Sequence, residues 1–224
     1  MSFLNLNWIK ENFTNNKFVF FEIGCAVLDT SCHIRELMPN AEIYAFEPSD
    51  YWHIINEPIA AKFNIRYLRY AFSDIDGPVL FNPSTTQFDN PHPWSGSMFK
   101  LEDVPFESHG KKYGDPYKVH SYRLESFCRD FNIIPDVIHL DTEGAEFKII
   151  CNMGDFKPKC IWAEVAGFGH YKNGVTRQEF DDALKNLGYT KIYTDENQWD
   201  ALYCLDGINF TEYTGIPTIL INNS

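Results

Sequence analysis

The sequence has few basic residues for its length. Its 224 residues include 19 Lys and Arg against 31 Asp and Glu, which gives a formal net charge of −12 at pH 7. A protein that follows a nucleic-acid backbone needs many Lys and Arg contacts to phosphates. We therefore expect no nucleic-acid partner and look instead for a small-molecule site.

Long apolar runs are also missing. The longest candidate, residues 18–28, is interrupted by Glu22 and Gly24 and falls short of the roughly 20 apolar residues of a membrane span. The first residues lack the charged stretch and apolar stretch of a secretory signal. The sequence thus predicts no membrane span and a cytoplasmic protein, and it leaves the oligomeric state open.

Two further motifs are absent. The six cysteines form no C-x-x-C pair of the kind found in zinc knuckles, so we expect most of them to be small buried residues. The segment 24–29 holds Gly24 alone, whereas a dinucleotide fold needs G-x-G-x-x-G to approach a pyrophosphate. This argues against a nicotinamide-dependent reductase.

The composition and the apolar patterns of the sequence predict one α/β domain. With 44% hydrophobic and 16% aromatic residues, the chain can bury one sizeable core, so residues 1–224 are expected to form a single domain. Apolar patterns predict alternating strands and helices, hence a doubly wound sheet. Strands are expected at 18–23, 42–46, 65–70, 79–81, 117–122, 137–140, 160–165, 191–194 and 201–205, and helices at 4–13 (within an N-terminal segment 1–16), 30–37, 54–63, 124–131, 145–153 and 176–187.

Carboxylates follow several of the expected strands. Glu22 and Gly24 end the first strand, and the acidic segment 139–146 ends the strand at 137–140. Open α/β sheets bind ligands at the carboxyl ends of parallel strands. A carboxylate and one close-approach glycine suit a cofactor without phosphates that carries a cationic sulfonium and an amino group. Gly24 also fits a plain strand-to-helix turn.

The second and third strands add cofactor candidates. Glu47 and Pro48 follow the second strand about 20 residues after the first turn, where α/β nucleotide folds bind ribose hydroxyls. Phe72, Ser73 and Asp74 follow the third strand and are predicted to flank a nucleobase. Ser and Asp are also common in turns, so Ser73 and Asp74 can simply form one.

These residues together resemble a known family. The series Glu22-Ile23-Gly24, Ala45-Phe46-Glu47-Pro48, Ala71-Phe72-Ser73-Asp74 and Leu140-Asp141-Thr142-Glu143-Gly144-Ala145-Glu146 is similar to the FkbM family of S-adenosylmethionine-dependent methyltransferases. The resemblance runs in order from about residue 18 to residue 165. Its most specific part is the hydrophobic-D-x-E-G-x-E signature.

The resemblance implies a Rossmann-like class I methyltransferase fold. That fold is a seven-stranded, mostly parallel sheet with helices on both faces and an antiparallel last strand. It also implies S-adenosylmethionine as cofactor, with Glu22, Gly24, Cys25, Glu47, Pro48, Phe72, Ser73, Asp74 and Asp141 as its expected contacts. The usual reaction is methylation of a hydroxyl on a sugar, lipid or polyketide. The chain departs from the family in having Leu28 where a second glycine is usual, and His139 where lysine is frequent.

Methyl transfer to a hydroxyl needs close positioning and a base that accepts the proton. Asp141 and Glu143 are the first candidates, and His139 shares the face of Asp141 by strand alternation. Each also has a structural interpretation. Glu143 and Glu146 can cap the following helix, and His139 can be a core histidine.

Substrate contacts are expected from three places. Segment 82–116 is predicted to be a long cap on the substrate side, and its Trp94 and Ser97 suit a carbohydrate ring and its hydroxyls. Glu164 ends a strand, and His170 follows it. Asp141, Glu143 and Glu164 offer oxygen ligands for Mg²⁺ or Ca²⁺, but substrate hydrogen bonding is the favoured interpretation, so no metal is predicted.

The sequence therefore predicts O-methylation of a small hydroxylated acceptor. Leu28 motivates one alternative, a non-catalytic domain that holds S-adenosylmethionine or its product S-adenosylhomocysteine. The enzyme would methylate an acceptor, whereas the non-catalytic domain would methylate none.

Overall fold

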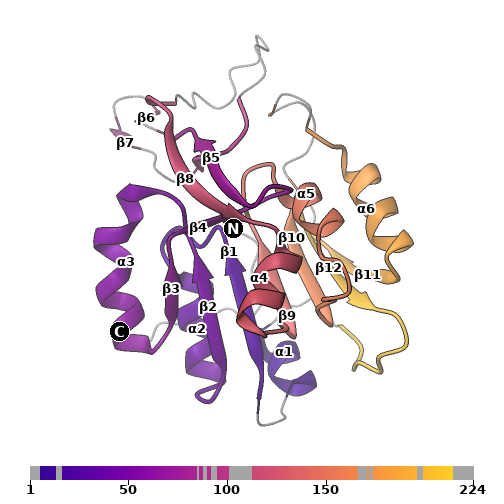
Figure 1. Cartoon of the computed structure of the whole chain (residues 1–224). Helices are drawn as coiled ribbons and strands as arrows, with labels where there is room; N and C mark the ends of the chain where they lie inside the picture. The colour runs from indigo at the N-terminus through magenta and orange to yellow at the C-terminus, as the bar shows by residue number, and fades with distance from the viewer. Residues whose placement is uncertain are drawn as a thin grey trace.

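The structure is a computed structural model of the chain. It describes residues 6–13, 17–84, 86–87, 90–91, 95–100, 113–165, 171, 174–195 and 199–213. Within these residues, strands and helices alternate and form one central sheet with helices packed against it (Figure 1). None of the helices in these ranges is long and apolar enough to cross a membrane.

The central sheet has seven strands in the order β11-β12-β10-β9-β1-β2-β3. Its neighbours pair in parallel except where β12 pairs with β10 and β11, so β12 runs against the other strands. This confirms the seven-stranded, mostly parallel sheet with an antiparallel last strand. The strands are β1 (Val19–Ile23), β2 (Glu42–Phe46), β3 (Arg66–Leu68), β9 (Val137–Leu140), β10 (Cys160–Glu164), β11 (Tyr189–Thr194) and β12 (Asp200–Leu205).

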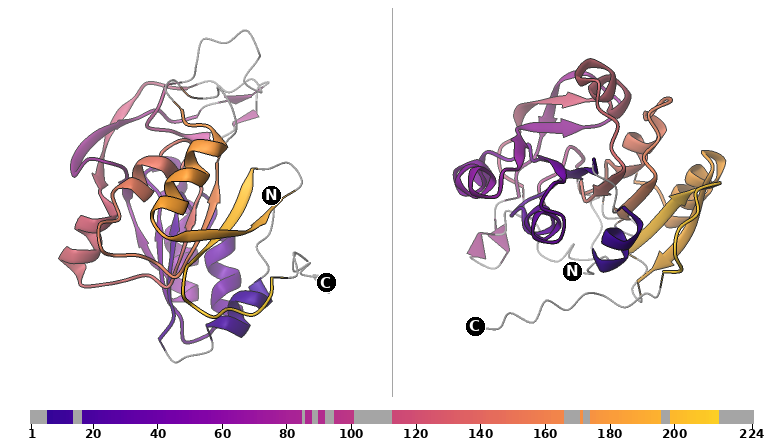
Figure 2. Two further views of the ribbon diagram at one scale, coloured as in Figure 1. Left: turned by 90° about the vertical axis from the view of Figure 1, so that its right-hand side faces the viewer. Right: turned by 90° about the horizontal axis from the view of Figure 1, so that it is seen from below.

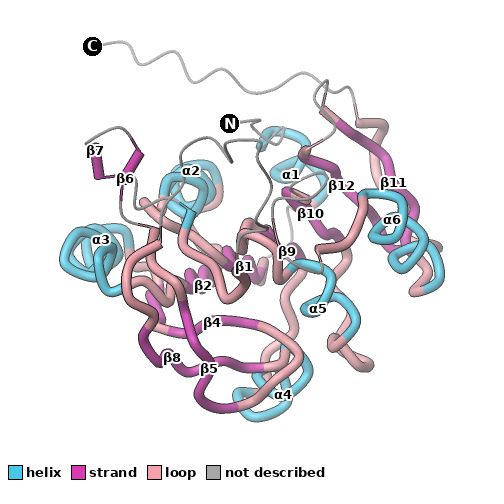
Figure 3. The backbone as a smooth tube through the Cα atoms, turned by 90° about the horizontal axis from the view of Figure 1, so that it is seen from above, coloured by secondary structure: helices cyan, strands magenta, loops and turns pink. Residues whose placement is uncertain are grey.

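Helices cover both faces of this sheet. Alternate side chains of β1 separate the two cores: Phe20 packs with α1 (Leu6–Asn12), α2 (Asp29–Leu37) and α3 (Asp50–Phe63), whereas Phe21 packs with α4 (Leu124–Phe131), α5 (Glu146–Cys151) and α6 (Arg177–Asn186). Figure 3 shows the two sets of helices on opposite sides of the strands. The left view of Figure 2 looks onto the edge formed by α6, β11 and β12.

A second sheet corrects the predicted third strand. The expected strand 65–70 is two strands, β3 and β4 (Tyr70–Phe72), because the chain leaves the central sheet at Arg69. β4 then pairs with β8 (Tyr117–Tyr122), and β8 pairs with β5 (Gly77–Phe81). Beyond this bend, the Phe72 ring packs edge-on against Phe46 of β2, with 4.8 Å between centroids. The predicted cap also holds a small strand pair, β6 (Thr86–Gln87) and β7 (Asn90–Pro91).

Candidate active site

A cavity of about 530 Å³ lies at the carboxyl edge of the central sheet. Residues on both sides of β9 line it. The set contributed by the β1 and β2 ends and by β4, here called the β1–β2 side, comprises Gly24, Cys25, Glu47, Pro48 and Phe72. The set contributed by β10 and the start of β12, here called the β10–β12 side, comprises Trp162, Glu164, Trp199 and Asp200. His139, Asp141 and Glu143 line the cavity between them.

Gly24 lets the first loop pack tightly against the end of β9. Its φ is +86°, and a Cβ at this position would lie 1.8 Å from the backbone oxygen of Asp141. The amides of Gly24 and Cys25 donate to the Phe46 carbonyl at 2.9 and 3.1 Å. A residue with a side chain cannot occupy this position without displacing β9 or the loop.

Leu28 adopts the backbone conformation that a glycine would take. Its φ is +63° and its side chain is fully buried. It caps the start of α2 and packs in the core on that face, and it is not among the residues that line the cavity. The departure from the family pattern therefore changes the core beneath the loop and leaves the cavity wall unobstructed.

Glu47 is buried and holds the first loop. Its Oε2 accepts from the Ala26 amide at 3.0 Å, and its Oε1 accepts from the Ser49 amide at 2.8 Å. Burial raises the pKa of Glu47 to about 7, and its two backbone hydrogen bonds oppose the rise. Asn56 of α3, a buried residue that the sequence did not single out, donates to the Ala26 carbonyl. Ala26 is thus fixed through both its amide and its carbonyl.

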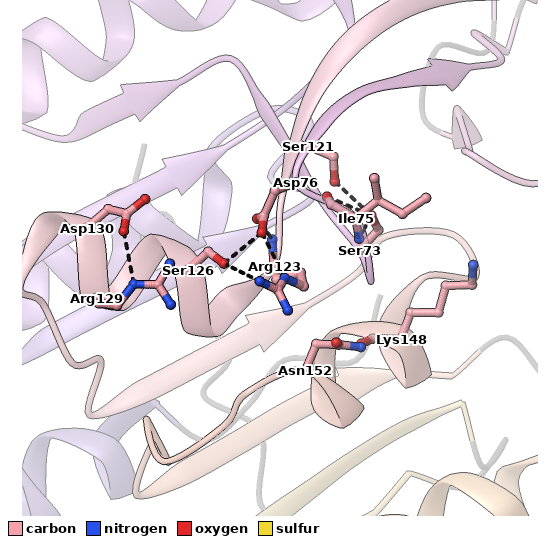
Figure 4. Close-up of polar contacts among 10 residues, drawn as sticks. All are labelled: Ser73, Ile75, Asp76, Ser121, Arg123, Ser126, Arg129, Asp130, Lys148 and Asn152. Atoms are coloured by element: carbon pink, nitrogen blue, oxygen red, sulfur yellow. Dashed lines mark hydrogen bonds and ion pairs between the residues drawn. The ribbon is translucent and has the colours of Figure 1, made fainter.

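Two predicted cofactor residues lie elsewhere. Ser73 is buried directly after β4 of the second sheet, and its hydroxyl lies 2.8 Å from that of Ser121 of β8 (Figure 4). Asp74 pairs with Lys148 of α5 at 3.1 Å. Neither is among the residues that line the cavity. The chain turns into the second sheet just before them, so that Ala71 and Phe72 line the cavity instead.

Three side chains form a row across neighbouring strands. His139 is the register partner of Glu22 on β1 and of Trp162 on β10. Its Nδ1 lies 3.9 Å from Glu22 Oε1, and its ring stacks on Trp162 with 3.7 Å between centroids. Ser31 fixes Glu22 by donating its amide to Oε2 at 3.0 Å and its hydroxyl to the same atom.

The acidic segment after β9 divides into distinct roles. Burial raises the pKa of Asp141 well above its usual value, and the charges of Glu164 and Glu143 raise it further. Glu146 is buried and accepts from the amides of Thr142 at 2.6 Å and Gly144 at 3.0 Å, so it orders the segment. Asp141 is therefore a cavity-facing carboxyl group whose affinity for a proton is raised.

Glu143 is held from two directions. It has a φ of +55°, and its carboxylate accepts from the Tyr171 hydroxyl. Ser97, from the predicted cap, donates its hydroxyl to the Glu143 carbonyl at 2.6 Å. Ser97 does not line the cavity, whereas its neighbours Gly96 and Met98 do. The described part of the cap thus reaches the cavity next to the acidic segment.

On the β10–β12 side, Trp162 and Asp200 are joined by a hydrogen bond of 2.9 Å from Nε1 to Oδ1. Glu164 and Asp200 face each other as cross-strand partners. The sequence singled out Glu164 but not Trp162, Trp199 or Asp200. Trp199 precedes β12 and Asp200 is its first residue, which is why the search at the carboxyl ends of strands missed them.

Some predictions cannot be placed. Trp94 and His170 lie outside the described residues. Among the residues that are described, no three His, Cys, Asp or Glu side chains are grouped so as to hold a metal ion. The site therefore rests on the carboxylates, His139 and the aromatic rings described above.

Comparison with known proteins identifies a matching family model and a similar protein. A family model described as the methyltransferase FkbM domain matches residues 23–191. The chain is 27% identical over 175 residues to "2-O-methyltransferase NoeI" of Sinorhizobium fredii (strain NBRC 101917 / NGR234), covering 75% of this chain and 72% of that protein. The family match includes Gly24, Glu47 and Asp141 and ends before Trp199 and Asp200.

Solved structures with similar folds have low sequence identity. Precorrin-6y C5,15-methyltransferase from Geobacter metallireducens GS-15 has a TM-score of 0.46 and 12% identity, with 88% of this chain and 85% of that chain covered. Ribosomal protein L11 methylase from Lactobacillus delbrueckii subsp. bulgaricus has the same TM-score and identity, with 88% and 74% covered.

Proposed function

This chain belongs to the FkbM family of methyltransferases, and on that premise we propose that it methylates a hydroxyl oxygen of a small acceptor. It is an S-adenosylmethionine-dependent methyltransferase. The observation that carries the proposal is the cavity at which the ends of β1, β2, β9 and β10 converge. The similarity to a 2-O-methyltransferase supports oxygen as the methylated atom.

The residues of the β1–β2 side fit S-adenosylmethionine, which when bound supplies an activated methyl group on a sulfonium. Gly24 lets the first loop lie against the end of β9, where the loop lines the cavity. Each carboxylate oxygen of Glu47 accepts one hydrogen bond from a backbone amide. Each oxygen has a further lone pair that can accept a second hydrogen bond. We assign these remaining acceptors to the ribose hydroxyls. Phe72 and Pro48 offer apolar surface for the adenine.

Asp141 and His139 are the proposed proton acceptors for the acceptor hydroxyl. Asp141 has a raised pKa and lies at the end of β9, between the two sides of the cavity. His139 directs Nδ1 toward Glu22, which leaves Nε2 for the hydroxyl. Glu143 is the weaker candidate because Tyr171 already donates to its carboxylate. We assign to Glu143 the positioning of the segment that follows β9.

The conformation of Leu28 supports the catalytic proposal over the non-catalytic alternative. That alternative rested on Leu28, and Leu28 is accommodated in a left-handed conformation within the core. A divalent metal held by Asp141, Glu143 and Glu164 is not the favoured interpretation, and the described part of the chain groups no three such side chains around a metal position; activity measured with and without a chelator would test it. The catalytic proposal requires no metal.

The first test is calorimetric titration with S-adenosylmethionine and with S-adenosylhomocysteine, followed by transfer of labelled methyl to hydroxylated acceptors. We expect binding of both in the wild type and in Asp141→Asn and His139→Gln. Methyl transfer should fall by roughly 100-fold or more in these variants, a usual size for general base catalysis. Binding without transfer to any acceptor would favour the non-catalytic alternative. No binding of either compound would refute the proposal.

A further inference from the structure

Two buried cysteines lie side by side in the central sheet, away from the cavity. Cys160 of β10 and Cys204 of β12 are register partners, and their Sγ atoms are 3.0 Å apart. Both thiols are free, and the two residues are 0% and 5% exposed. Because a disulfide holds its sulfurs about 2.0 Å apart, a shift of about 1 Å would bring these two sulfurs to bonding distance.

The backbone around this pair also suits a disulfide. The Leu205 amide donates to the Lys159 carbonyl at 2.9 Å. The Cys160 amide points the other way and donates to the Asp136 carbonyl, just before β9, at 3.1 Å. Cys160 and Cys204 therefore form a non-hydrogen-bonded pair of the antiparallel ladder. In such a pair the Cα atoms are about 4.5 Å apart, which lies within the range of about 4.4 to 6.8 Å that a disulfide spans.

The two ends of the described chain pack on the face of the sheet that holds this pair. α1 and residues 207–213, here called the terminal clasp, belong to or pack against the same core as the two cysteines, and Figure 3 shows α1 beside β10 and β12. Asn12 joins the two parts of the clasp, because its side chain donates to the Thr211 hydroxyl at 2.7 Å and accepts from the Thr211 amide at 2.8 Å. Trp8 donates from Nε1 to the Thr211 carbonyl at 2.8 Å. A reagent from solvent therefore reaches the sulfurs more easily when the clasp opens.

We propose that a peroxide oxidises Cys160 and Cys204 to a reversible disulfide that links β10 to β12, and that the terminal clasp controls the access of the oxidant. The inference does not depend on the proposed function. The bond closes the part of the chain that contains α6 and β11. It also joins the two strands that carry Trp162 and Asp200 at the cavity.

The oxidation balances with one molecule of hydrogen peroxide. The Cys204 sulfur, the more exposed of the two, attacks one peroxide oxygen, the O–O bond breaks, and a sulfenic acid and water form. The Cys160 sulfur then attacks Cys204 Sγ, so that the S–S bond forms, the S–O bond breaks and a second water leaves with the Cys160 proton. Burial raises the pKa of the Cys160 thiol, so Cys160 keeps this proton until the second step. The two thiols lose two electrons in all, and the peroxide gains them.

The test is oxidation of the full chain with hydrogen peroxide, followed by alkylation of the remaining thiols and peptide mapping without reductant. We expect the first disulfide to join the peptides of Cys160 and Cys204, and dithiothreitol should reverse it. The two cysteines are 44 positions apart, and a disulfide that closes so long a loop should raise the urea midpoint of unfolding by roughly 1 M. Cys204→Ala should abolish both the joined peptide and the rise in the midpoint.

Cys128→Ala is the matched control for this substitution. Cys128 is also fully buried, but it lies in the core on the opposite face of the sheet. This variant should keep both the joined peptide and the rise in the midpoint. If Cys204→Ala fails to fold, the peptide map of the wild type decides alone, because it identifies the two cysteines that are joined.

Asn12→Ala tests the terminal clasp. It removes both hydrogen bonds between the Asn12 side chain and Thr211, so the clasp should open more often and the disulfide should form roughly 10-fold faster. Asn152→Ala is the matched control. Both asparagines donate to the carbonyl four residues earlier, so the two variants lose that bond alike, and only Asn12→Ala loosens the clasp. Asn152→Ala should leave the rate unchanged.

Three results would overturn the disulfide: a first disulfide between other cysteines such as Cys25 and Cys32, peroxide products that are only sulfinic or sulfonic acids, or no reaction of Cys160 and Cys204. Equal acceleration in Asn12→Ala and Asn152→Ala would overturn the role of the clasp. It would show that unfolding of the whole chain admits the oxidant.

Discussion

The two sides of the cavity differ in how the chain builds them. The β1–β2 side depends on the position of the loop backbone. Gly24 packs against β9, and the side chains of Glu47 and Asn56 hold the amide and the carbonyl of Ala26. The β10–β12 side is made by side chains in register, with Trp162 bonded to Asp200. Backbone geometry suits a ligand that does not change within a family. Side chains can be exchanged without moving the sheet, which suits an acceptor that does change.

The largest expected effect is on the backbone-built side. Gly24→Ala should weaken binding of S-adenosylhomocysteine by at least about 100-fold and lower the free energy of unfolding by more than about 4 kcal/mol, a size reserved for severe steric or core damage. The reason is the 1.8 Å approach of a Cβ to the Asp141 oxygen. Calorimetry and urea unfolding measure the two effects.

Gly188→Ala provides the matched control for this change. Gly188 has a φ of +88°, close to the +86° of Gly24, but nothing lies within 4 Å of its Cβ position. It should lose only about 1–2 kcal/mol for the left-handed backbone and keep full affinity. If the two variants behave alike, backbone strain and not the close approach to β9 explains the glycine.

Substitutions of Leu28 should show that the first loop depends on the hydrophobic core beneath it. Leu28→Ala keeps the positive φ and removes a fully buried side chain, so we expect a loss of about 3 to 5 kcal/mol. Leu28→Gly also relieves a left-handed conformation worth about 1–2 kcal/mol, so it should be no more destabilising than Leu28→Ala. Urea unfolding compares them. Tighter cofactor binding in Leu28→Gly would show instead that the family's glycine acts on the cavity.

The sequence could predict the backbone-built side because parallel strands end at one edge. Glu22 lies near the carboxyl end of β1, Gly24 and Glu47 follow β1 and β2, and each lines the cavity as that rule requires. Trp199 and Asp200 escaped the rule because β12 is antiparallel, so its beginning lies where β10 ends. Asn56 escaped because it acts from the interior of a helix. The same rule put Ser73 and Asp74 at the cavity, but they do not line it. The reason is that the chain turns into the second sheet before it reaches them.

The ionisation of Glu47 should make the β1–β2 side sensitive to pH. Burial raises the pKa of this carboxyl from 4.5 to about 7, so between these values the folded state binds more protons than the unfolded state. Its contribution to stability is therefore present below about pH 4.5 and is lost as pH rises toward 7, by at most about 3 kcal/mol. Glu47→Gln should remove this slope in urea unfolding measured between pH 5 and pH 8.

Cofactor binding should respond to the same ionisation with the opposite sign. The ionised Glu47 accepts hydrogen bonds from ribose hydroxyls better than the neutral acid does, so affinity for S-adenosylhomocysteine should rise as pH passes through about 7. Glu57→Gln, on the exposed surface of α3, should keep the wild-type profile. A flat profile in the wild type would mean that Glu47 does not reach the ribose.

The smallest effect is expected where the cavity meets the cap. Tyr171→Phe removes the hydroxyl that donates to the Glu143 carboxylate, and it should cost about 1 kcal/mol, the usual net worth of a hydrogen bond. Tyr189→Phe removes a similar bond of 2.7 Å to the Pro158 carbonyl, away from the cavity. Both should lower stability alike in urea unfolding, and neither should change affinity for S-adenosylhomocysteine. Only Tyr171→Phe should slow methyl transfer, because Glu143 then loses the partner that fixes the segment after β9. If both variants slow transfer equally, loss of stability alone accounts for the effect, and Glu143 has no positioning role.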